Sequence, residues 1–296
     1  MNKRLLALLA ATTASTIYGI NHTIAKGLMP TIIGAYGFIL LRVLGAAVIF
    51  WSISFFYPSE KIDKKDWIRI IGCSFAGMAI NMLAFFKGLS LSTPINSSVV
   101  ITLVPVLLLL LSAVFLKERI TKIKALGIGI GLMGALVLIL FGAKTQVNAP
   151  NIPLGNTLFI VNAMAYSSYL IMVKPLVVKY SSITLMKFFF LFAIVINLPV
   201  GYSEFTQVQW FALSFDAIWK LTFVVVATTV LTYLFNIYAL KQLKPSTVGA
   251  FIYLQPLIAA GFAVFVGSDT LTAFRIGAAV LIFAGVFLST RTGKSS

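Results

Sequence analysis

Ten apolar segments divide the chain, and each is long enough to cross the roughly 30 Å hydrocarbon core of a bilayer as a helix of about 20 residues. They cover residues 5–25, 35–56, 67–88, 94–116, 123–142, 154–174, 183–202, 218–240, 245–267 and 272–290. Hydrophobic residues make up 60% of the 296 residues and charged residues only 10%, whereas a soluble domain carries about 25% charged residues. Because the apolar runs are continuous, they favour helices over a β-barrel. We therefore predict an all-α integral membrane protein with ten transmembrane helices.

Lysine and arginine are unevenly distributed between the two ends of these segments. With the N-terminus inside, Arg42 lies within a span, and of the 23 lysines and arginines the outer side receives only Lys26, Lys87, Lys144, Lys220 and Arg275. Cytoplasmic loops carry the excess of basic residues in membrane proteins. We expect a multi-pass protein of the cell inner membrane with both termini in the cytoplasm. These loops also explain the net charge of +16, so no nucleic-acid partner is expected.

The two halves of the chain contain a repeated pattern. Residues 86–118 align without gaps onto residues 237–269. The matched positions include Pro94 with Pro245, Pro105 with Pro256, and Glu118 with Asp269. A polar connector follows residue 142, so we predict two five-helix repeats, residues 1–147 and 148–296. Because five is odd, the second repeat is inverted, a construction common in secondary transporters.

Several short motifs carry a family resemblance across the whole chain. They are Phe86-Lys87-Gly88-Leu89-Ser90, Val104-Pro105-Val106, Leu116-Lys117-Glu118-Arg119-Ile120-Thr121, Tyr238-Ala239-Leu240, Gln255-Pro256-Leu257 and, near the start, Tyr18-Gly19-Ile20-Asn21 together with Arg42. With these motifs the chain resembles the EamA branch of the drug/metabolite transporter superfamily. It departs from the family pattern at Ser268-Asp269, where Gly-Glu is usual. The resemblance implies a ten-helix exporter or facilitator of small metabolites, often amino acids, with a central cavity between the halves.

Polar side chains within the spans are the candidates for lining such a cavity, because a polar group in hydrocarbon needs a partner or water. Ser15, Tyr18 and His22 share one face of the first helix by their spacing. Thr229, Thr232 and Asn236 share a face of the eighth. The predicted substrate-binding residues are Tyr18, His22, Asn81, Asn162, Tyr166, Thr232, Asn236 and Gln255. For each of these residues a purely structural role is the alternative, in which the side chain hydrogen-bonds to its own helix or a neighbour, or packs between helices.

A second group of residues is interpreted as gating or structural. Arg42 lies within the second span, and the sequence leaves open whether it tethers helices or contacts substrate. Pro94, Pro105, Pro245 and Pro256 lie at mirrored positions and are predicted hinges. Gly127 and Gly131 form a small-residue face, which serves either packing within the bundle or a dimer interface. Both a monomer and a homodimer therefore stay open.

Several functions are disfavoured by what the sequence contains. Its seven acidic residues fall in loops or at span ends, and it has one histidine and one cysteine, Cys73. We therefore expect no enzyme, no metal, no cofactor, and downhill facilitation in place of carboxylate-based proton coupling. The leading interpretation is a transporter that exports small organic solutes, amino acids or related metabolites. Drugs, nucleotide sugars and lipid-linked sugars are the alternative substrates, and a membrane scaffold or receptor is the alternative without transport.

Overall fold

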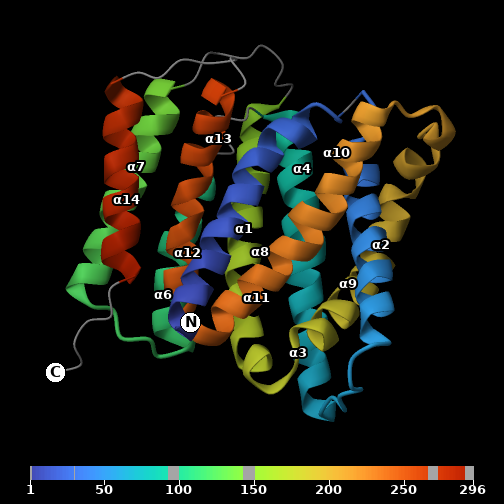
Figure 1. Cartoon of the computed structure of the whole chain (residues 1–296), viewed down its shortest axis with the longest axis horizontal. Coiled ribbons are helices and arrows are strands. Elements are labelled where there is room, and N and C mark those ends of the chain that lie inside the picture. The colour runs from blue at the N-terminus through green and yellow to red at the C-terminus, as the bar shows by residue number, and fades with distance from the viewer. Residues whose placement is uncertain (1, 30, 93–99, 143–150, 266–272, 291–296) are drawn as a thin grey trace.

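The structure, a computed structural model, describes residues 2–29, 31–92, 100–142, 151–265 and 273–290, and these form a bundle of helices (Figure 1). The prediction of an all-α chain with ten spans is confirmed. In the first half the helices are α1 (Lys3–Lys26), α2 (Ala35–Ser54), α3 (Trp67–Ser74) with η2 (Phe75–Ile80) and α4 (Asn81–Leu91), α6 (Leu103–Phe115) and α7 (Lys122–Gly142). A short η1 (Lys64–Asp66) precedes α3. The fourth predicted span begins at residue 94, which lies outside the described residues.

The second half repeats this order. Its helices are α8 (Ile152–Lys179), α9 (Ser182–Thr206), α10 (Phe215–Val225) with η4 (Val226–Leu231) and α11 (Thr232–Gln242), α12 (Pro245–Ala250) with η5 (Phe251–Tyr253) and α13 (Leu254–Phe265), and α14 (Ala273–Thr290). A short η3 (Trp210–Ala212) lies between α9 and α10. The division between the repeats at residues 147 and 148 stays a prediction, because it falls outside the described residues.

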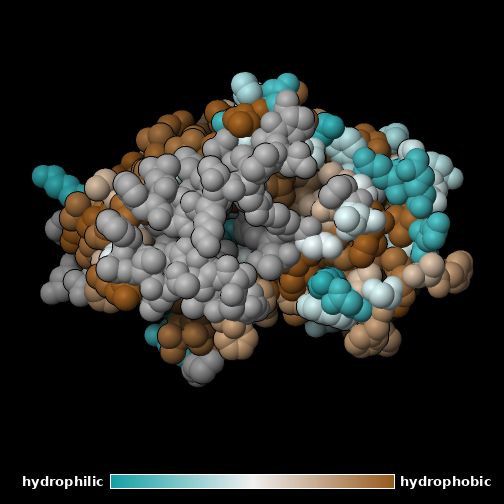
Figure 2. Space-filling view, turned by 90° about the horizontal axis from the view of Figure 1, so that it is seen from above, coloured by the Kyte–Doolittle hydropathy of each residue, from teal (hydrophilic) through white to brown (hydrophobic). Residues whose placement is uncertain are grey.

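Five of the described helical runs are both long and apolar enough to cross a bilayer by length and composition. They are Ala35–Ser54, Lys64–Leu91, Ile152–Lys179, Ser182–Thr206 and Phe215–Gln242. Leu103–Phe115 and Ile276–Ser289 are shorter apolar helices. Large apolar side chains such as Val48, Val114 and Val195 lie on the outside of the bundle, each at least 66% exposed. Such a surface is expected against lipid, and brown apolar side chains also line much of the rim in Figure 2.

The packing of the helices follows an inverted repeat. Helix α2 packs along α9 at one edge of the bundle, and α7 packs along α14 at the other. Helix α1 packs on α11 and α13, and its counterpart α8 packs on α4 and α6. Exchanging the two halves therefore leaves this set of contacts unchanged, as a two-fold axis in the membrane plane requires.

Glycines bring α7 and α14 into close contact. A Cβ added to Gly285 would lie 2.4 Å from the backbone nitrogen of Gly131, and one added to Gly127 would lie 2.6 Å from that of Ser289. The side chains at these places must be absent for the backbones to approach so closely. The small-residue face of Gly127 and Gly131 thus packs within the bundle.

The third and eighth spans each contain one π-helical segment. The alignment that pairs Phe86 with Ile237 also pairs the η2 segment, Phe75–Ile80, with the η4 segment, Val226–Leu231. A π-helical turn inserts one extra residue into the helix and frees backbone carbonyls, and such turns are frequent at functional sites. Both segments lie at the middle of their spans and adjoin the cavity described next.

Candidate functional site

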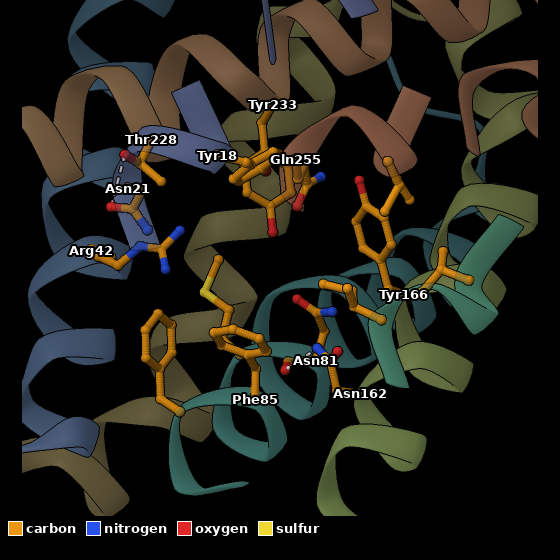
Figure 3. A pocket seen from close by; sticks show the side chains of 15 residues that line it. Tyr18, Asn21, Arg42, Asn81, Phe85, Asn162, Tyr166, Thr228, Tyr233 and Gln255 are labelled. Atoms are coloured by element: carbon orange, nitrogen blue, oxygen red, sulfur yellow. Dashed lines mark hydrogen bonds between the residues drawn. The ribbon is translucent and has the colours of Figure 1, made fainter. Parts of the chain in front are cut away.

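A cavity of about 100 Å³ lies between the two halves, near the middle of the spans (Figure 3). This volume is several times the roughly 10–15 Å³ that one water needs on the same measure. Its lining residues come from α1, α2, α4, α6, α8, α11 and α13 and from the turns next to them. They are Tyr18, Asn21, Arg42, Asn81, Met82, Phe85, Phe86, Ile101, Val104, Asn162, Tyr166, Thr228, Tyr233, Ile252 and Gln255.

Five of the eight predicted substrate-binding residues lie on the wall of this cavity. They are Tyr18, Asn81, Asn162, Tyr166 and Gln255. The Asn162 side chain is held in place because its Nδ2 donates to the backbone oxygen of Asn81 at 2.8 Å. This bond joins α8 of the second half to α4 of the first. Their role in binding a substrate stays a prediction.

The other three predicted binding residues do not line the cavity. Thr232 is fully buried, and its hydroxyl donates to the Thr228 backbone oxygen at 2.6 Å. Asn236 lies behind the wall, where its Nδ2 donates to the Tyr166 hydroxyl at 3.4 Å. The side chain of His22 lies outside the described part of the structure. Thr232 and Asn236 therefore support wall residues and do not face the space themselves.

Asn21, Thr228 and Tyr233 are polar wall residues that sequence reasoning did not select. The Thr228 hydroxyl donates to Asn21 Oδ1 at 3.1 Å (Figure 3). The prediction for the eighth span assumed a regular helical period across residues 229–236, but η4 interrupts that period. As a result Thr228 and Tyr233, five residues apart, face the cavity together. Asn21 had a signal in the sequence, since it follows Tyr18 by three residues on one helix.

Among the described residues that line the cavity, Arg42 is the one with a cationic side chain. It is 4% exposed, and its Nε donates to Thr229 Oγ1 at 3.0 Å. The guanidinium carbon lies 5.4 Å from the centre of the Phe86 ring and 6.0 Å from that of Phe38. Figure 3 shows the two terminal nitrogens of the guanidinium pointing into the cavity. Thr229 in turn donates to the Val224 backbone oxygen at 2.8 Å, which satisfies a carbonyl at the π-helical turn.

Three of the four predicted hinge prolines, Pro105, Pro245 and Pro256, lie at or near the starts of helices and do not line the cavity. Pro105 is buried near the start of α6, where a turn at Thr102 precedes that helix. Pro256 lies near the start of α13, directly after η5. Proline cannot donate a backbone hydrogen bond and clashes with the carbonyl four residues earlier, so the helix tightens or breaks there. Pro245 begins α12, and Pro94 lies outside the described residues. Hinge motion stays a prediction.

The lower end of the bundle in Figure 1, where α1 begins and α11 ends, is joined across the two halves. Glu118 Oε1 accepts hydrogen bonds from Lys124 Nζ and from the Ser246 hydroxyl of α12. Glu118 and Lys124 are only 8% and 6% exposed. Lys174 of α8 donates to the Leu243 backbone oxygen at 2.9 Å. All six residues of α12 are buried, so this end is tightly packed.

The turn before Glu118 directs its carboxylate into the bundle. Lys117 has a φ of 52°, a left-handed conformation that costs a residue with a side chain roughly 1–2 kcal/mol. This turn brings the Glu118 backbone N–H within 3.1 Å of the Ser112 oxygen at the end of α6. The strain at Lys117 is therefore offset by the buried contacts of Glu118.

Within the described residues, no group of three or more histidine, cysteine, aspartate or glutamate side chains is placed to hold a metal ion. The wall of the cavity consists of aromatic rings, amides, hydroxyls and one guanidinium. Such a wall can bind and orient a small solute through hydrogen bonds and ring contacts.

A polar cavity at the interface of two inverted halves, within a bundle of apolar spans, defines a membrane transporter. The sequence profile of the EamA-like transporter family matches residues 5–140 and 153–291, one copy in each half. The chain belongs to this family. The two matches cover most of the chain, and the predicted resemblance is confirmed.

Several relatives of the chain are named as uncharacterized transporters. An uncharacterized transporter of Archaeoglobus fulgidus is 24% identical over 90% of this chain and 89% of its own length. The uncharacterized transporter YyaM of Bacillus subtilis is 25% identical over 82% and 80%, and a WAT1-related protein of Arabidopsis thaliana is 22% identical over 95% and 84%. A solved crystal structure matches 96% of both chains with a TM-score of 0.80 and 17% identity, which shows the shared fold.

Proposed function

We propose that this transporter moves small organic solutes, such as amino acids or related metabolites, out of the cell across the inner membrane by alternating access. One observation carries the proposal: the polar cavity lies between two inverted halves, and the lower end beyond it is closed by contacts between those halves. Two halves related in this way can exchange roles, so that the closed end opens as the other closes.

The proposal orients the lower end toward the cytoplasm. Helix α1 begins and α14 ends at that end (Figure 1), and by the positive-inside rule the end with most of the basic loop residues faces the cytoplasm. In this orientation the contacts of Glu118 with Lys124 and Ser246 form the cytoplasmic gate. Breaking them admits solute from the cytoplasm to the cavity.

The nature of the wall favours facilitated passage of small polar solutes. The polar groups of its described lining residues are neutral apart from Arg42, whereas carriers that couple to protons commonly use a carboxylate within the membrane. A nucleotide sugar carries a diphosphate, for which a wall with one cation is poorly matched.

The proposal is tested with purified protein in liposomes loaded with a labelled mixture of amino acids and organic acids. We expect selective loss of some solutes from the vesicles without any imposed gradient, at a rate that rises with the amount of protein. Loss only under a pH gradient would contradict facilitation. Retention of every solute would contradict transport and favour a scaffold or receptor. Empty liposomes and liposomes with heat-denatured protein are the controls.

A further inference from the structure

The charge of the cavity wall is unbalanced. Arg42 is almost completely buried, and burying a cation without a counterion is costly. Among the described residues, Arg42 contacts the Thr229 hydroxyl and the faces of the Phe38 and Phe86 rings, all of which are neutral. These contacts reduce the cost of burial, but none of them neutralises the charge.

The contacts of Arg42 also fix which part of it stays available. Its Nε is engaged by Thr229 at 3.0 Å, and the rings of Phe38 and Phe86 hold the guanidinium from the side. The edge with the two terminal nitrogens points into the cavity (Figure 3). This edge is the one that forms two parallel hydrogen bonds to a carboxylate. A guanidinium held in this way loses little further conformational entropy on binding.

We propose that the transported solute presents a carboxylate to Arg42 and supplies the counterion that the cavity wall lacks. This inference rests on the proposed transport function and names the class of solute as organic monocarboxylates. The two oxygens of the carboxylate accept from the terminal nitrogens of Arg42. The organic body lies between the rings of Phe85 and Tyr166, within reach of the amides of Asn81 and Gln255, which surround the same space in Figure 3.

The number of charges on the wall sets the preferred charge of the solute. One guanidinium balances one negative charge, so a monocarboxylate makes the occupied cavity neutral. A dianion or a phosphate ester leaves a second negative charge unpaired in a site of low dielectric constant. A zwitterion brings its ammonium group into a wall that already carries a positive charge, and a cation is repelled outright. The expected order of affinity is monocarboxylate, zwitterion, uncharged analogue, cation.

A set of solutes that share one body tests this order. The four compounds are 3-phenylpropionate, phenylalanine, 3-phenylpropanamide and 2-phenylethylamine, and the same four head groups on a four-carbon aliphatic body form a second set. Binding to the unaltered protein in detergent is measured by calorimetry, and flux is measured in liposomes. We expect a monocarboxylate to bind at least about 10-fold more tightly than its amide, the usual effect of a charge-assisted hydrogen bond.

Substitution of the arginine then assigns the preference to one side chain. Arg42→Gln is expected to reduce monocarboxylate affinity about 10-fold or more and to reduce the affinity for the uncharged amide much less, so that the preference for the monocarboxylate is lost. Arg42→Lys keeps the positive charge but lacks the two parallel N–H groups of the guanidinium, so an intermediate loss of monocarboxylate affinity is expected. Arg69→Gln is the matched control, since Arg69 is exposed on α3. Its affinities should equal those of the unaltered protein.

The outcomes separate this inference from the proposed function. Equal binding of all four head groups by the unaltered protein would overturn the carboxylate site, even if every compound crosses the membrane. An undiminished preference for monocarboxylates in a folded Arg42→Gln protein would also overturn it. Selective binding of monocarboxylates without any flux would keep the site and overturn transport. Because the solute sets need no variant, the inference stays testable even if Arg42→Gln fails to fold.

Discussion

The two π-helical segments have the same place in the repeat but differ in their side chains. In the η2 segment the residues are apolar, and its carbonyls accept from the second half: Tyr233 donates to the Gly77 oxygen at 3.1 Å, and Asn197 to the Met78 oxygen at 3.4 Å. In the η4 segment Thr228 and Thr229 supply hydroxyls of their own. These hydroxyls bind Asn21 and Arg42 of the first half.

The two halves therefore share a backbone conformation but differ in the chemistry of their side chains. The position of the π-helical turn is the same in both halves, and both turns lie beside the same cavity. The side chains at equivalent positions serve opposite purposes: Gly77 makes room for the ring of Tyr169, whereas Thr228 lines the cavity. A symmetric scaffold thus carries an asymmetric wall, and the Arg42 guanidinium is hydrogen-bonded by Thr229 of the second half and packed by Phe38 and Phe86 of the first.

The largest effect is expected at the lower end of the bundle. Glu118→Gln removes the counter-charge of the buried Lys124, and breaking such a pair costs about 3–5 kcal/mol. We expect a lower melting temperature in detergent and faster thiol labelling of Thr247→Cys of α12, measured in a Cys73→Ser background. Lys122→Gln is the control, because it changes an exposed charge at the same end. Unchanged labelling in Glu118→Gln would contradict the gate.

The next effect tests whether the two π-helical segments tolerate the same side chain. A Cβ at Gly77 would lie 2.6 Å from the Tyr169 ring, so Gly77→Thr should destabilise the protein by about 1–3 kcal/mol through overpacking. At the equivalent position, Thr228→Val keeps the shape and loses one hydrogen bond to Asn21, worth about 1 kcal/mol. Thermal unfolding in detergent measures both. Equal losses of stability in the two variants would contradict the proposed difference between the η2 and η4 segments.

A smaller effect is expected where the second half fixes Arg42. Thr229→Val removes the hydroxyl that accepts from Arg42 Nε, so the apparent KM for a transported monocarboxylate should rise about 10-fold, or about 1.4 kcal/mol, with little change in kcat. Thr222→Val is the control on the same span, since its exposed hydroxyl donates only within its own helix. A fall in kcat with an unchanged KM would show that Thr229 serves gating and not the position of the guanidinium.

The smallest effect concerns two carboxylates, each of which caps the start of a helix: Glu204 caps α2 and Glu60 caps α9. Glu204 accepts from the backbone nitrogens of Tyr36, at 2.6 Å, and Gly37, at the start of α2. Glu60 accepts from the Ser181 nitrogen at the start of α9, at 2.9 Å. Partial burial by itself would raise the pKa of Glu60, but hydrogen bonds from Thr184 and Ser181 lower it overall. Glu60→Gln should cost about 0.3–1 kcal/mol at pH 7, the usual effect of a negative charge near a helix N-terminus.

The lowered pKa of Glu60 gives this effect a pH dependence. The folded protein binds the proton less tightly than the unfolded chain, so the stabilisation is fully present above the ordinary glutamate pKa of about 4.3 and is lost as the pH falls through the folded value. The difference in melting temperature between the unaltered protein and Glu60→Gln should therefore be constant from pH 7 to 5 and shrink toward pH 3.5. A difference that grows on acidification would contradict the cap.

The sequence by itself determined the number and places of the spans, the helical class and the repeat. These depend on runs of apolar residues and on two pairs of prolines, which are properties of neighbouring residues along the chain. A span forms wherever about 20 apolar residues follow one another, whatever it packs against. The proline pair Pro105 and Pro256 illustrates this, because the helix is interrupted shortly before each of these prolines, at equivalent positions of the two halves.

Only the tertiary structure decided which polar side chains share the cavity. Thr232 and Asn236 fit a regular helical face in the sequence, but one extra residue in η4 rotates the helix, so Thr228 and Tyr233 face the space instead. Within its own helix Arg42 contacts only the face of the Phe38 ring among the described residues, and Thr229, 187 positions further along the chain, accepts the hydrogen bond that orients its Nε. The face that a helix turns inward depends on its neighbours, and the local sequence does not encode that rotation.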